Sequence, residues 1–115
     1  MNPTNRKVFI ANYQDKDFSS ADQFGEVVFV TKGFVPLHDM TKVRNGLKKF
    51  VDLSSQHDYL VINGPSVIVT LLSILWFTKH GYLNVLSWDG KTSSYRPFVV
   101  GIDSITEQLD MNGNT

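Results

Sequence analysis

The sequence contains no cysteine and no excess of either charge, and each absence excludes a class of protein. Without cysteine there is no disulfide framework, no thiolate zinc site and no thiol nucleophile, which fits an intracellular, cytoplasmic protein. The 11 basic residues are balanced by 11 acidic ones, so the chain lacks the basic surplus that a general nucleic-acid binder needs. What remains is a globular chain with 42% hydrophobic residues, enough to build one core.

Long apolar runs, repeats and known phosphate-binding motifs are also missing. The first seven residues, Met1–Lys7, are not followed by the apolar segment of a signal peptide. No uninterrupted stretch approaches the roughly 20 apolar residues of a membrane span. The glycine and lysine spacing of a Walker loop or a dinucleotide fingerprint is absent. We therefore expect one domain over residues 1–115, ordered over about 7–100, with a flexible N-terminus and a loose tail over 103–115.

Short apolar runs separated by turn residues predict five strands. Continuous runs of this kind are typical of strands covered on both faces. Asp89-Gly90 predicts a tight hairpin, and Pro97 predicts an edge strand, because proline cannot donate to a ladder. The expected strands are Val8–Ala11, Glu26–Thr31, Tyr59–Ile62, Leu83–Trp88 and Tyr95–Val100.

Helical spacing and capping residues predict two longer helices between these strands. Asp39 can cap the first. The second is expected to begin with Pro65 as its first helical residue, to run to about His80 and to end at Gly81. A short helix over residues 19–24 is a further possibility.

The order of these elements predicts the fold class. Two strand–helix–strand units in sequence imply right-handed crossovers and a largely parallel sheet. We expect a small Rossmann-like, three-layer α/β domain in the order β-β-α-β-α-β-β, with a mainly parallel five-stranded sheet and a C-terminal antiparallel hairpin. In the order of its elements alone, the chain resembles small Rossmann-like nucleotide-binding and sensor domains over about residues 7–100.

The carboxyl ends of the first and third strands form the strongest candidate site, because ligands of open α/β sheets bind where the strand order reverses. The third strand is followed by Asn63, Gly64, Pro65 and Ser66. Gly64 permits a close backbone approach, and the helix start presents N–H groups and a positive dipole end that favour an anion. Alternatively, Asn63 or Ser66 only caps the helix.

This site leads to the first hypothesis, a non-enzymatic protein that senses or sequesters a small phosphorylated ligand, with a nucleotide or nucleotide-derived signal as the leading case. Asn12 and Tyr13 would contribute from the first strand, with Tyr13 packed on a base or ribose. Lys91 or Arg96, from the same chain or from a neighbouring subunit, could neutralise the remaining charge. Tyr13 could equally be an ordinary residue of the rim with its hydroxyl in water. No cofactor is implied.

Acidic residues after the first strand suggest a rival hypothesis, a small phosphoester hydrolase using Asp15, Asp17 or His57. Asp15, Asp17 and Asp22 could hold magnesium, although such clusters are more often solvated turns and caps. A zinc site is not expected, since no two histidines have ligand spacing. A Ser–His–Asp set stays open, because its members converge from distant positions.

The second long helix suggests a third hypothesis, because residues 67–77 leave almost no polar face. A helix that is hydrophobic all round is buried on more than one side. The sheet would cover one side, and a second copy of the chain could cover the other, giving a homodimer or higher homo-oligomer. The same helix, with the aromatic hairpin of Trp88 and Tyr95, could instead serve a protein–protein interaction module or inhibitor.

Overall fold

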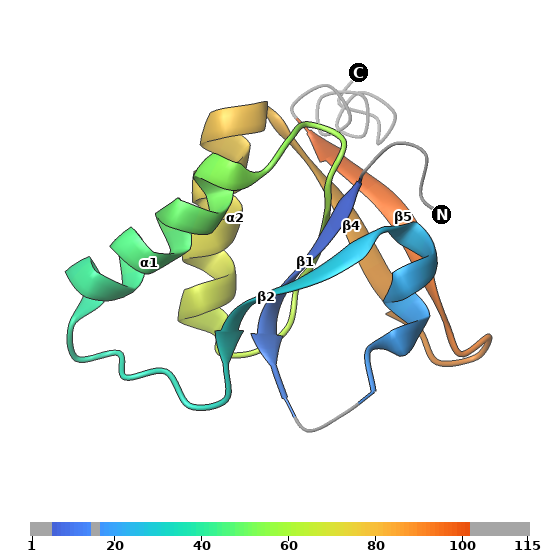
Figure 1. The fold of residues 1–115 in the computed structure, drawn as a ribbon, viewed down its shortest axis with the longest axis horizontal. Coiled ribbons are helices and arrows are strands. Elements are labelled where there is room, and N and C mark those ends of the chain that lie inside the picture. The colour runs from blue at the N-terminus through green and yellow to red at the C-terminus, as the bar shows by residue number, and fades with distance from the viewer. Residues whose placement is uncertain (1–5, 15–16, 102–115) are drawn as a thin grey trace, which may run out of the picture.

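Five strands form one mixed sheet with three helices packed on it (Figure 1). The structure is a computed structural model and describes residues 6–14 and 17–101. The flexible ends predicted before residue 6 and beyond residue 102 lie outside the described residues. The strands are β1 (Lys7–Tyr13), β2 (Glu26–Lys32), β3 (Tyr59–Val61), β4 (Tyr82–Asp89) and β5 (Ser94–Gly101), and the helices are η1 (Ser19–Phe24), α1 (Met40–Leu53) and α2 (Ser66–His80).

The strand order is β2-β1-β3-β4-β5, in which β1 to β4 run parallel and β5 is antiparallel to β4. The prediction of a mainly parallel α/β sheet with an antiparallel hairpin is therefore confirmed. The chain moves from β1 outward to β2, then crosses back through α1 to β3 on the other side of β1. The strand order thus reverses beside β1, and the ends of β1 and β3 are neighbours.

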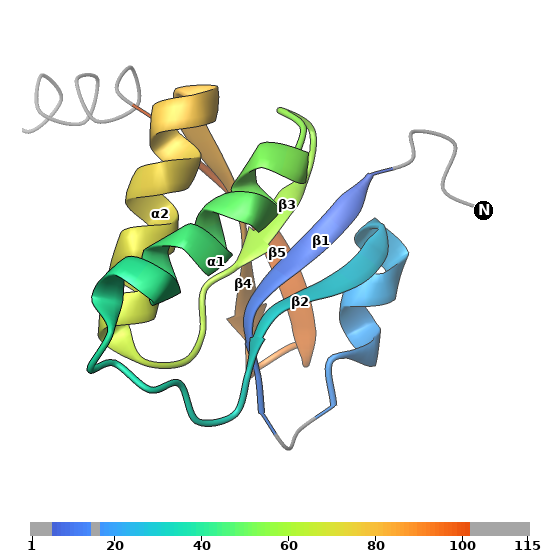
Figure 2. The same ribbon diagram turned by 60° about the vertical axis from the view of Figure 1, so that its left-hand side comes forward.

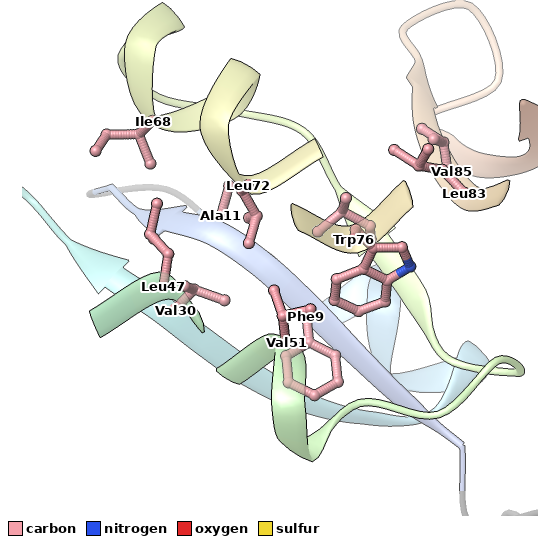
Figure 3. Close-up of a cluster of buried hydrophobic side chains, with 11 residues drawn as sticks. Phe9, Ala11, Val30, Leu47, Val51, Ile68, Leu72, Trp76, Leu83 and Val85 are labelled. Carbon is pink, nitrogen blue, oxygen red and sulfur yellow. The ribbon is translucent and has the colours of Figure 1, made fainter. Parts of the chain in front are cut away.

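The sheet separates two hydrophobic clusters, one on each face, because successive side chains of a strand point to opposite faces. Phe9 and Ala11 face α1 and α2, whereas Val8 and Ile10 face η1. Figure 2 shows both long helices on one face of the sheet and η1 on the other. Figure 3 shows the larger cluster, in which Trp76 lies next to Phe9; their ring centroids are 5.2 Å apart.

The capping residues place both long helices close to where the sequence predicts them. Asp39 accepts a hydrogen bond from the Lys42 N–H at 3.1 Å and so caps α1. Gly81 ends α2 in the left-handed conformation, with φ +80°. Pro65 is a correction, because it occupies the N-cap position and α2 begins at Ser66.

The last hairpin also differs from its prediction in one respect. Pro97 lies on β5, which is an edge strand as predicted. The turn is longer than a two-residue turn, since residues 90–93 join β4 to β5 and Ser93 takes φ +50°. Asp89 stabilises this turn by accepting the Lys91 N–H at 2.9 Å.

The outer flank of α2 is exposed in the single chain. Ile68, Leu72 and Trp76 are buried against the sheet and α1, but Val67 and Ile74 are 45% and 57% exposed. No helix within residues 6–14 and 17–101 has the length and apolar character needed to cross a membrane.

Candidate functional site

The ends of β1 and β3 meet through two reciprocal hydrogen bonds. Asn63 accepts the Asn12 N–H on its side-chain oxygen at 3.1 Å, and its amide nitrogen donates to the Asn12 carbonyl at 2.5 Å. The Asn63 side chain therefore extends the pairing of β1 with β3 to a position two residues beyond the last backbone pair, Ile10 and Val61. Both the oxygen and the nitrogen of this amide bond to β1, so it positions the segment that follows it.

The Asn12 side chain joins the end of β1 to the end of β2. Its side chain is buried, donates to the Gly33 carbonyl at 3.1 Å and accepts from the Thr31 hydroxyl at 2.9 Å. The Asn12 side chain also presses against Gly64, where a Cβ would lie 2.7 Å from the Asn12 Cβ. Gly64 has φ +102°, a conformation that glycine alone adopts easily. The predicted convergence of the two strand ends is thus built around one buried asparagine.

The first turn of α2 begins beside Asn12, Asn63 and Gly64, which we call the α2 corner, and it has no capping side chain. Val69 donates the first helical hydrogen bond, to the Pro65 carbonyl at 3.0 Å. The N–H groups of Ser66, Val67 and Ile68 precede it and have no helical acceptor, and Pro65 at the N-cap supplies no side-chain oxygen. In α1 the Asp39 carboxylate fills this role. Neither Asn63 nor Ser66 caps the helix, because the Asn63 amide bonds to Asn12 and Ser66 is already the first helical residue. The Ser66 side chain is exposed beside these donors.

Tyr13 lies with a different group of residues. Its ring packs edge-to-face on Phe29, with the centroids 4.9 Å apart, and lies 6.3 Å from Phe18. Phe18 and Phe29 belong to the cluster under η1, whereas α2 packs on the opposite face of the sheet. A single ligand that contacts both Tyr13 and Ser66 would have to pass over the end of β1.

Lys91 and Arg96 lie on the β4–β5 hairpin, away from the first turn of α2. Both are exposed, and Figures 1 and 2 both show the turn of this hairpin apart from the start of α2. Arg96 donates from its Nε to Asp89 Oδ2 at 2.8 Å. Within one copy of the chain these two cations do not join the corner of Asn12, Asn63 and Ser66.

The residues of the hydrolase hypothesis are not brought together. Asp17 follows the end of β1, whereas His57 precedes the start of β3. Because the two strands are parallel, these positions lie at opposite ends of the strands. Asp15 lies outside the described residues. In the part of the chain that the structure describes, no three His, Cys, Asp or Glu side chains group as a metal site would require.

Sequence reasoning missed a serine–histidine contact between the ends of the two long helices. His80 Nε2 lies 2.7 Å from the Ser54 hydroxyl, which itself donates to the Val51 carbonyl at 2.5 Å. Because that hydroxyl proton is committed, Ser54 accepts from Nε2–H and is not activated as a nucleophile. Ser54 is also buried, at 5% exposure. The contact therefore joins two helix ends, and no spacing rule in the sequence relates residues 54 and 80.

Asp58 completes this region as a structural carboxylate. It is buried and accepts the N–H groups of Lys7, at 2.9 Å, and Ser55, at 2.8 Å. Burial is the largest of the influences that lower the pKa of His80; the Lys79 charge acts in the same direction, and Asp58 opposes both. Ser54 and His80 join the ends of α1 and α2, and Asp58 joins the start of β1 to the segment after α1. These three residues are structural and do not form a catalytic triad.

Residues 4–102 match the family model described as phage Pam3 gp32-like protein. The chain belongs to this family. No curated protein and no solved structure matches it.

Proposed function

We propose that this Pam3 gp32-like protein binds, without chemical conversion, a small phosphorylated ligand at the first turn of α2. The support is the open set of N–H donors at Ser66, Val67 and Ile68, at the point where the strand order reverses. Three adjacent N–H groups and the positive end of a 15-residue helix favour an anion there. Ser66 adds an exposed hydroxyl within the same turn.

The surrounding architecture supports this proposal. In doubly wound Rossmann-like sheets, ligands bind beyond the carboxyl ends of the strands that flank the reversal, and we assign this protein to that group. Asn12 and Asn63 act as positioning residues, because their side chains are occupied with main-chain and Thr31 partners. The anion would then be held by the backbone and Ser66. A nucleotide in the cytoplasm remains the leading candidate for the ligand.

The test is a binding measurement by isothermal titration calorimetry with inorganic phosphate and a panel of nucleotides. Ser66→Glu places a carboxylate beside the donors and is expected to weaken binding at least about tenfold by occupying and repelling the site. Thr70→Glu is the matched control, since Thr70 is also exposed on α2 but lies one turn beyond the open donors. Equal affinity of Ser66→Glu and wild type would reject this site.

A second function is favoured by the exposed apolar residues of α2 and the hairpin. Val67 and Ile74 lie two turns apart on the same side of α2 and are 45% and 57% exposed, and Trp88 of the hairpin is 51% exposed; apolar residues grouped on one exposed face mark interaction surfaces. A second copy of the chain is the partner we propose for α2. Native mass spectrometry should then give an oligomer that Ile74→Glu dissociates, and a monomeric wild type would remove this proposal.

A further inference from the structure

A cavity lies beside η1, on the face of the sheet opposite α1 and α2. Its volume is about 310 Å³, roughly ten times the liquid volume of one water molecule. The lining residues come from the end of β1, from η1 and the segment before it, and from β2. They are Tyr13, Asp17, Phe18, Ser19, Asp22, Val27 and Phe29.

Aromatic rings form the walls of this cavity, which we call the η1 cavity. The rings of Tyr13 and Phe29 are inclined at 79°, and those of Phe18 and Phe29 at 66° with their centroids 5.7 Å apart. Phe18 is buried and Tyr13 is 41% exposed, so Tyr13 is the ring that reaches solvent furthest. The three rings contact one another and so form one continuous aromatic surface on the cavity, and ring faces attract cations.

The polar lining of the η1 cavity is acidic. Asp17 and Asp22 are the charged residues among the described residues that line it, and the ion pairs of residues 6–14 and 17–101 join Lys48 to Asp52 and Arg96 to Asp89 instead. Asp17 accepts the Ser19 N–H at 2.8 Å, and the hydrogen bonds from Ser19 lower the pKa of Asp17. The cavity therefore carries two carboxylates beside three aromatic rings.

We infer that the η1 cavity binds an organic cation, an alkylammonium group carried either by a small molecule or by a lysine side chain of a partner. A purely apolar ligand would gain nothing from Asp17 and Asp22, and an anion would be repelled by them. Aromatic rings with nearby carboxylates are the combination that recognises alkylammonium groups. This site is distinct from the anion site proposed at α2, since the sheet lies between them.

Choline and its uncharged isostere 3,3-dimethyl-1-butanol separate cation binding from simple apolar filling. In a ¹H–¹⁵N NMR titration, choline is expected to shift the amides of Phe18, Ser19 and Phe29 with a Kd of about 1 mM. The uncharged isostere is expected to bind about fivefold more weakly or worse, because it lacks attraction to rings and carboxylates. Equal binding of both compounds, or no choline shift at these amides, would overturn the inference.

Three variants locate the binding. Asp22→Asn and Tyr13→Leu are each expected to weaken choline binding about fivefold, and Asp22 is exposed, so its substitution leaves the fold intact. Asp52→Asn is the matched control, because Asp52 is an exposed carboxylate on α1 that pairs with Lys48. Repeating the titration with N-acetyl-lysine amide distinguishes the sources: tighter binding than choline indicates a side chain, and weaker binding indicates a small quaternary ligand.

Discussion

Gly64 is the residue on which the contact between β1 and the start of α2 depends. An added Cβ would lie 2.7 Å from the Asn12 Cβ, at φ +102°. We expect Gly64→Ala to lower the free energy of unfolding by about 2–4 kcal/mol, from backbone strain and overpacking together. Chemical denaturation measures this.

Gly46→Ala is the matched control for that change. Gly46 lies within α1, and nothing is within 4 Å of the position where its Cβ would be. Alanine there should raise the free energy of unfolding by about 0.5–1 kcal/mol through helix propensity. If both variants behaved alike, the corner at Gly64 would not be close-packed as described.

His80 is a single residue whose titration should be visible in stability. Burial, and then the Lys79 charge, lower its pKa in the folded state below the ordinary value of 6.5, against the opposing influence of Asp58. The stabilising contribution is therefore complete above pH 6.5 and is lost as the pH falls from there toward the folded-state pKa, because the unfolded chain takes up the proton first. Urea denaturation between pH 8 and pH 5 should show this loss. His80→Gln should flatten that interval, and an unchanged slope would contradict the assignment.

At the scale of elements, the end of α2 holds the end of α1. Lys79 Nζ donates to the carbonyls of Val51, Asp52 and Ser54 at 3.0, 2.8 and 2.6 Å. These carbonyls belong to the negative end of the α1 dipole, where a cation is favourable. Lys79 thus joins the two helices that cover one face of the sheet.

Lys79→Met should lower the free energy of unfolding by about 1 kcal/mol, since three hydrogen bonds to a helix end are lost from a partly exposed group. Thermal unfolding should detect this as a shift of about 4 °C. Lys48→Met provides the comparison, because the Lys48–Asp52 pair is more than half exposed on both sides and such pairs contribute little. An equal effect of the two substitutions would mean that Lys79 does not join the helices.

The elements themselves could be predicted because their limits are local. The Asp39 cap, Gly81 and the edge proline Pro97 act within a few residues of their own positions. The position of Tyr13 could not be predicted in this way. Alternation from Phe9 and Ala11 would point Tyr13 toward the long helices, but at the end of β1 its ring turns to Phe18 and Phe29.

At the scale of the whole molecule, strand order determines which predicted residues meet. The reversal beside β1 joins Asn12 to Asn63 and Gly64, as the sequence-based order predicts. Lys91 and Arg96 lie apart from the start of α2, because the β4–β5 hairpin forms the outer side of the sheet beyond β3. The contact of Ser54 with His80 likewise depends on how α1 and α2 pack, and no local pattern predicts it.

The central claim is that the open first turn of α2 holds a phosphorylated anion. The most direct measurement is a ¹H–¹⁵N NMR titration of the wild-type protein with inorganic phosphate and with nucleotides. We predict that the amides of Ser66, Val67 and Ile68 shift most and that the shifts saturate. Saturating shifts confined to other residues, or none at these three amides for any ligand of the panel, would contradict the claim.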